Sequence, residues 1–285
     1  IKSLCCVHKY KIGPIRYTVC MSGAKRSLYI LLSMLWILSV TACGRETEKE
    51  LVIFAASSLT DVFQELGEEY QLENPRVSVQ FNFAGSSNLR MQLEYGAKAD
   101  LYASANSFQI DLALKSDAVQ GIPKQFASNE LVLVTPKANN KVNSLKDLMN
   151  QDVKMIFGAS VVPIGVYSGT ILNKLAADPV FGSEYRKGVE QNIVSYEPNV
   201  RMILNKIVLK QADAAFVYAT DINSVDADLV SVIRIPDKYN ASVGYFMLET
   251  SNVANPIEAM KFLEFISSEK GLNILKSYGF QESDE

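Results

Sequence analysis

The sequence predicts an α/β protein, and two features of the chain indicate this class. Apolar runs of strand length, such as Leu51–Ala56, are typical of buried parallel strands. These runs alternate with helical patterns that begin at Ser, Gly or Asn. With 48% hydrophobic and 21% charged residues, the 285-residue chain can bury a substantial core and is too balanced to be disordered.

Taken in order, the elements follow from local patterns. The apolar and alternating runs predict strands at 51–56, 77–83, 99–104, 130–135, 154–158, 214–218, 230–233 and 244–248. The helical patterns lie at 58–72, 89–95, 107–115, 144–150, 166–177, 200–211, 256–267 and 269–277. Ser58 and Asp61 resemble a capping box that begins the first helix, and Gly96 is expected to end the second.

The N-terminal segment is predicted to be an export signal. In residues 21–42, Lys25 and Arg26 precede a 13-residue apolar run, which is shorter than the about 20 residues of a membrane span. Val40-Thr41-Ala42-Cys43 resembles a bacterial lipobox, which predicts lipid attachment at Cys43. Residues 1–20 precede Met21 and are interpreted as a mis-called upstream extension. The alternatives are a plain signal peptide, a signal anchor or a long n-region.

Residues 43–285 have a restricted chemistry. They contain 22 basic and 31 acidic residues, a net charge of −9, with no His or Trp and with Cys43 as their one Cys. This composition excludes Ser-His-Asp and Cys-His catalysis, zinc sites of the His or Cys type and disulfides. It gives no case for nucleic-acid binding. Residues 43–50 are polar and are expected to form a tether.

Four expected helix starts are candidates for binding an anion. A helix N-terminus carries unpaired N–H groups and about half a positive charge, so four that converge would supply on the order of two charges. Ser and Asn are also ordinary helix caps, so each start alone is weak evidence. The four starts are Ser57-Ser58, Ser86-Ser87, Pro163-Ile164-Gly165 and Asn199-Val200.

The same residues resemble the molybdate-binding proteins of ABC importers. The similarity lies in short motifs that occur in the family's order between residues 51 and 281. They are Phe54-Ala55-Ala56-Ser57-Ser58-Leu59-Thr60, Phe83-Ala84-Gly85-Ser86-Ser87-Asn88-Leu89, Gly96-Ala97-Lys98-Ala99-Asp100-Leu101-Tyr102, Val162-Pro163-Ile164-Gly165-Val166-Tyr167, Asn199-Val200-Arg201, Phe216-Val217-Tyr218-Ala219-Thr220-Asp221 and Tyr278-Gly279-Phe280.

The resemblance implies a two-lobed, periplasmic-binding-protein-like fold of type 2 with a ligand cleft between the lobes. Lobe 1 would comprise 51–132 plus 237–285, and lobe 2 would comprise 133–236. It implies no catalysis and no cofactor. Molybdate or tungstate would be held by neutral donors, with no direct protein–metal ligands, from Ser58, Ser86, Ile164, Val200 and Tyr218.

The resemblance also implies partners and a location. A permease and an ATPase would take over the oxyanion from a receptor that is expected to be a monomer outside the cytoplasm of a bacterium. The lipobox at Cys43 predicts that this receptor is lipid-anchored to the cell membrane. Two positions depart from the family's pattern, and a third carries a charge. Ile164 stands where a small residue is common, and Asn199 where an acidic residue is frequent; Arg201 is interpreted as a structural or surface charge.

Three other functions remain open from the sequence. The same receptor could bind sulfate, phosphate or an organic anion. A surface enzyme such as a glycosidase could use carboxylates, although the candidates are better interpreted as solvated helix faces. The third is a purely structural lipoprotein. The candidate carboxylates are Asp61, Glu65, Glu68, Glu69 and Glu94.

Overall fold

The computed structural model describes residues 10–12, 15–17 and 49–282, and it divides into two compact units, 1–47 and 48–285. In the first unit, the described residues form an antiparallel hairpin of β1 (Tyr10–Ile12) and β2 (Ile15–Tyr17). The predicted signal peptide and Cys43 lie outside the described residues, as does most of segment 1–20. Among the helices that are described, none combines the length and apolarity needed to cross a membrane.

The first lobe of the second unit is built on a five-stranded sheet of order β4-β3-β5-β12-β6. Its strands are β3 (Lys49–Ala56), β4 (Val77–Ala84), β5 (Leu101–Ser104), β6 (Val119–Asn129) and β12 (Val243–Thr250). β3 runs parallel to both of its neighbours, and β12 runs antiparallel to β5 and β6. The helical elements of this lobe are η1 (Ser57–Leu59), α2 (Thr60–Glu73), α3 (Ser86–Glu94), α4 (Ser107–Lys115), α8 (Pro256–Ile266) and α9 (Glu269–Ser277).

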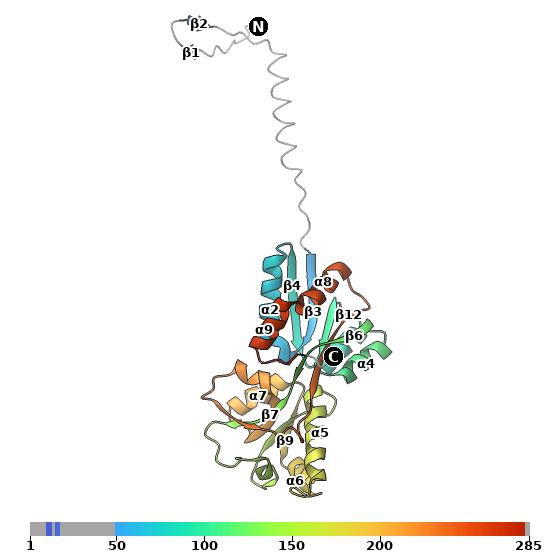
Figure 1. The fold of residues 1–285 in the computed structure, drawn as a ribbon, viewed down its shortest axis with the longest axis vertical. Coiled ribbons are helices and arrows are strands. Elements are labelled where there is room, and N and C mark those ends of the chain that lie inside the picture. Colours follow the sequence, from blue (N-terminus) through green and yellow to red (C-terminus); the bar gives the residue numbers. More distant parts are fainter. Residues whose placement is uncertain (1–9, 13–14, 18–48, 283–285) are drawn as a thin grey trace, which may run out of the picture. The chain divides into compact units, whose positions relative to one another are not determined.

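The second lobe is built on a five-stranded sheet of order β11-β7-β10-β8-β9. Figure 1 shows β7 and β9 of this lobe together with α5, α6 and α7. Its strands are β7 (Leu131–Pro136), β8 (Met155–Gly158), β9 (Ile193–Glu197), β10 (Ala214–Tyr218) and β11 (Val230–Arg234). β8 runs parallel to β9 and β10, and β7 runs antiparallel to β10 and β11. Its helical elements are η2 (Leu145–Met149), α5 (Pro163–Ala177), α6 (Tyr185–Gln191), α7 (Val200–Val208) and η3 (Ala219–Ser224).

Two connections join the lobes, and one side chain holds them together. The chain leaves the first sheet at Asn129 and returns to it at Val243. Between these points, the Asn240 amide donates to the Leu131 carbonyl at 2.9 Å and accepts from the Leu131 N–H at 3.2 Å. The predicted lobe boundaries, at 132/133 and 236/237, stay a prediction.

The helices pack through the apolar faces that their sequences predict. In α7, the buried residues are spaced at i, i+3, i+4 and i+7, which places them on one face of the helix: Val200, Ile203, Leu204 and Ile207. In α2, the Phe63 ring contacts Phe81 of β4, with ring centroids 6.0 Å apart. The α/β alternation predicted from the sequence is therefore confirmed in both lobes.

The predicted capping box at Ser58 and Asp61 is wrong. Residues 57–59 form the 3₁₀ turn η1, so α2 begins at Thr60, whose hydroxyl donates to the Ser57 carbonyl at 2.7 Å. The Ser58 hydroxyl oxygen accepts a hydrogen bond from Tyr245. The predicted helix at 144–150 is the 3₁₀ turn η2, and the structure adds β6, β9 and α6, which were not predicted.

Candidate functional site

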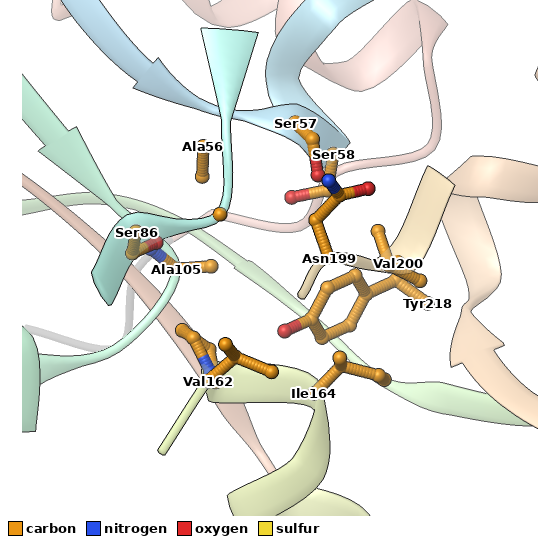
Figure 2. A pocket seen from close by; sticks show the side chains of 12 residues that line it. Ala56, Ser57, Ser58, Ser86, Ala105, Val162, Ile164, Asn199, Val200 and Tyr218 are labelled. Carbon is orange, nitrogen blue, oxygen red and sulfur yellow. The ribbon is translucent and has the colours of Figure 1, made fainter. Parts of the chain in front are cut away.

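A pocket lies where helix starts from both lobes meet (Figure 2). It contains about 230 Å³ free of protein atoms, part of it open to solvent. All five residues predicted to contact a ligand line it: Ser58, Ser86, Ile164, Val200 and Tyr218. The remaining lining residues are Ala56, Ser57, Gly85, Ala105, Val162, Pro163 and Asn199. The sequence could not establish that the helix starts converge, and the structure shows that they do.

The backbone supplies part of the pocket's polar lining. α3, α5 and α7 begin at Ser86, Pro163 and Val200, so their first-turn N–H groups have no acceptor within their own helices. Pro163 has no N–H to offer, which leaves Ile164 as the first donor of α5. The Asn199 side chain caps α7 by accepting from the Met202 N–H at 3.0 Å, as expected for a helix cap.

Two serine hydroxyls are oriented by hydrogen bonds that they accept. The Ser86 Oγ accepts from the Ala105 N–H at 3.2 Å, and the Ser58 Oγ accepts from the Tyr245 hydroxyl at 3.1 Å. A serine hydroxyl carries one proton, and neither proton is needed for these contacts. Both serines can therefore donate to a guest in the pocket.

Tyr218 adds a third hydroxyl, which points into the pocket from the end of β10 (Figure 2). It is buried and has no hydrogen-bond partner among the described protein atoms. Burial raises the pKa of the Tyr218 phenol well above its ordinary value, and the neighbouring Tyr245, Tyr167 and Asp221 add to the effect. The phenol therefore keeps its proton and is available as a donor.

Charged side chains are absent from the pocket lining. None of the 12 described lining residues is Lys, Arg, Asp or Glu. Arg201, next to Val200, forms ion pairs with two carboxylates. Its Nη2 donates a hydrogen bond to Asp61 Oδ2 at 2.5 Å, and its Nε lies 3.1 Å from Asp221 Oδ1 without hydrogen-bond geometry. These ion pairs agree with the structural interpretation of Arg201. Burial raises the pKa of Asp221 to about 7, and the charge of Arg201 opposes this rise.

The carboxylates considered for enzyme chemistry lie outside the pocket lining. Asp61 pairs with Arg201, Glu69 with Lys270 and Glu94 with Arg90. Glu65 accepts a hydrogen bond from Tyr278, and Glu68 is exposed. Within the described part of the chain, no group of three or more His, Cys, Asp or Glu residues could hold a metal ion. The pocket's chemistry is therefore that of hydroxyl and N–H donors.

Ala105 and Tyr245 orient the serine hydroxyls, and sequence reasoning missed both. Their contacts with Ser86 and Ser58 span 19 and 187 residues. No local pattern marks such distant partners. The signal available in the sequence was limited to the helix starts themselves.

Comparison with known proteins gives consistent matches. Residues 51–281 match the family described as bacterial extracellular solute-binding protein. The molybdate-binding protein ModA of Mycobacterium tuberculosis is 32% identical over 262 residues, which cover 88% of this chain and 95% of that protein. YvgL of Bacillus subtilis, assigned as an ABC transporter substrate-binding lipoprotein, is 28% identical over 82% of this chain and 87% of its own. Among solved structures, a substrate-binding domain assigned to a molybdenum ABC transporter of Clostridium difficile has a TM-score of 0.61 at 27% identity, covering 82% of this chain and 99% of that domain.

Proposed function

Because the chain belongs to the family of bacterial extracellular solute-binding proteins, we propose that it captures molybdate or tungstate and delivers the oxyanion to an ABC importer. The convergence of five neutral donor residues from both lobes in one pocket is the observation that carries this proposal. The relative from M. tuberculosis, named as a molybdate-binding protein, supports this choice of ligand.

The oxyanion would be held without any charged side chain. Ser58, Ser86 and Tyr218 would donate hydroxyl protons, and Ile164 and Val200 would donate backbone N–H groups. The helix N-termini add positive potential, which falls off within the first turn and therefore acts only on a bound anion. The molybdenum or tungsten atom would have no protein ligand, and no cofactor is needed.

A lining made of donors selects among oxyanions in two ways. A guest that is too small leaves buried donors unpaired, which costs affinity and disfavours sulfate. A guest that carries a proton, such as hydrogen phosphate, finds no carboxylate to accept it, and a hydroxyl that accepted this proton would have to turn its own proton elsewhere. Both effects favour a large and fully ionised oxyanion.

Capture would occur by closure of the lobes around the anion. Contacts between the lobes involve chain neighbours of the lining residues Val162 and Val200. The Gln109 amide of α4 donates to the Val161 carbonyl at 2.9 Å, and Arg201 of α7 pairs with Asp61 of α2 at 2.5 Å. Opening the cleft would break both contacts, so they would contribute to the stability of the closed state.

The proposed partners are a membrane permease and an ATPase, which this monomeric receptor would serve without catalysing a reaction. An extracytoplasmic position fits the family. A lipid anchor at Cys43 is proposed from the lipobox and is supported by the lipoprotein assigned in B. subtilis. A Cys43→Ala variant should lose its association with membranes; continued association with normal processing would refute the anchor.

Calorimetric titration of residues 43–285 with molybdate, tungstate, sulfate and phosphate tests the proposed ligand. We expect tight binding of molybdate or tungstate and a rise in melting temperature on binding. Tight sulfate binding without molybdate binding would instead indicate the same fold serving a different anion. No change in melting temperature with any of the four anions would favour a structural lipoprotein.

A further inference from the structure

A line of buried hydrogen bonds runs from the connection between the lobes to the pocket. It begins at Asn129, the last residue of β6, whose Nδ2 lies 3.4 Å from the hydroxyl of Tyr245 in β12. It continues from the Tyr245 hydroxyl to the Ser58 Oγ at 3.1 Å. All three side chains are buried.

Asn129 fixes the direction of this line. Its Oδ1 accepts the N–H of Glu130 at 2.9 Å, so its Nδ2 faces the other way and also donates to Thr220 Oγ1 at 2.8 Å. An amide nitrogen only donates, so the Tyr245 oxygen is the acceptor in its contact with Asn129. The single phenol proton of Tyr245 is then directed to Ser58.

The consequence for Ser58 is that its own proton cannot point toward Tyr245. Among the described residues, the Ser58 hydroxyl has no other hydrogen-bond partner. Burial raises the pKa of Tyr245 well above its ordinary value, so the phenol proton stays in place across the physiological range. The acceptor left for the Ser58 proton is a guest in the pocket.

We propose that Asn129 and Tyr245 are positioning residues that keep Ser58 a donor toward the ligand and thereby favour oxyanions without a proton. This inference rests on the proposed function and adds to it the residues that set the selectivity. Neither side chain lines the pocket, and the hydrogen bonds of both lead to it through Ser58.

Two substitutions test the donor-to-acceptor direction of these hydrogen bonds. Tyr245→Phe removes the hydroxyl that donates to Ser58 but keeps the ring packed against Tyr218 and Phe280. Asn129→Asp replaces the donating nitrogen by an oxygen of nearly the same shape. The Tyr245 proton would then turn to residue 129, and the Tyr245 oxygen would attract the Ser58 proton away from the pocket.

The readout is the ratio of sulfate to phosphate affinity, measured by competition with molybdate at a mildly alkaline pH, where most of the phosphate is the hydrogen phosphate dianion. Sulfate and hydrogen phosphate are similar in size and charge and differ by one proton. We expect the ratio to fall about three- to tenfold in Tyr245→Phe and about tenfold or more in Asn129→Asp. The matched control is Tyr185→Phe, which removes a buried hydroxyl bonded to the Leu145 carbonyl, away from the pocket, and should leave the ratio unchanged.

Equal weakening of sulfate and phosphate would overturn the inference, because a merely structural role leaves the ratio constant. A wild-type protein that binds none of the three anions would overturn the proposed function itself. Thermal unfolding verifies that each variant is folded, and if one variant does not fold, the ratio measured on the other decides.

Discussion

Arg201 of α7 forms an ion pair with Asp61 of α2 and so joins the second lobe to the first, with Nη2 and Oδ2 2.5 Å apart. Its Nε lies 3.1 Å from Asp221 Oδ1 of its own lobe, an ion pair without hydrogen-bond geometry, and the Asp221 carboxylate is fully buried. Because Arg201 and Asp221 belong to the same lobe, the contact of the guanidinium with Asp61 is the one that changes when the lobes separate.

Asp61→Asn should weaken molybdate binding about two- to fivefold, because a partly exposed ion pair contributes up to about 1 kcal/mol. The loss should lie mainly in faster dissociation, since the pair stabilises the closed state. Stopped-flow release of molybdate measures it. Glu190→Gln, which breaks the exposed Arg186–Glu190 pair within α6, is the control and should leave dissociation unchanged; an equal effect in both variants would argue against a role in closure.

Tyr218→Phe should lower the affinity for molybdate without lowering the stability of the ligand-free protein. Its hydroxyl has no protein partner, so removing it should leave the free energy of unfolding of the ligand-free protein unchanged or slightly higher. A hydrogen bond to a charged guest contributes about 1.5–3 kcal/mol, so molybdate affinity should fall tenfold or more. Calorimetry and thermal unfolding measure the two quantities.

Tyr185→Phe should behave in the opposite way, with lower stability because the Leu145 carbonyl loses its partner, and with unchanged affinity. If Tyr218→Phe binds molybdate as tightly as the wild type, Tyr218 is not a ligand contact.

Gly85→Ala should hold the lobes apart. A Cβ at Gly85, in the first lobe, would lie 2.2 Å from the Pro198 carbonyl oxygen, in the second. Such an overlap costs about 1–3 kcal/mol, so affinity should fall about five- to a hundredfold. Small-angle scattering with molybdate present should show less compaction than in the wild type.

The control for this prediction is Gly169→Ala in α5, where a Cβ meets no atom within 4 Å. That change should raise stability slightly, because Ala favours the helix, and should not alter affinity. Normal compaction in Gly85→Ala would show that the contact with Pro198 yields without opening the cleft.

Asp221 should make stability depend on pH in a direction unusual for a carboxylate. Its folded pKa of about 7 lies above the ordinary value of 3.8, so between these limits the folded state binds more protons than the unfolded state. Its contribution to stability therefore increases as pH falls from about 7 to about 4. Melting temperatures of the wild type and Asp221→Asn over this range measure the effect as their difference. A difference that stays constant with pH would contradict it.

The sequence predicted the local parts of the site well. The starts of α3, α5 and α7 were visible because Ser, Pro and Asn at a strand-to-helix transition leave a local signature, whereas Ser57-Ser58 proved to be a 3₁₀ turn ahead of α2. The capping box failed because residues 57–59 form a 3₁₀ turn, and the Ser58 hydroxyl bonds instead with Tyr245, a partner 187 residues away. β6 was missed because Gly121 and Pro123 interrupt its pattern, although it pairs with β12 along most of its length. Local sequence patterns do not predict contacts between residues that are far apart in the chain.

The amide of Asn240, which bonds to both backbone groups of Leu131, has a consequence for the energetics of capture. If the two connections were not bonded to each other, the lobes could adopt many relative orientations. Ligand binding would then include the entropic cost of restricting the lobes to one orientation. Since the connections are held side by side, most of that entropy is lost when the chain folds. The donors are thus preorganised, and more of their interaction energy remains for affinity.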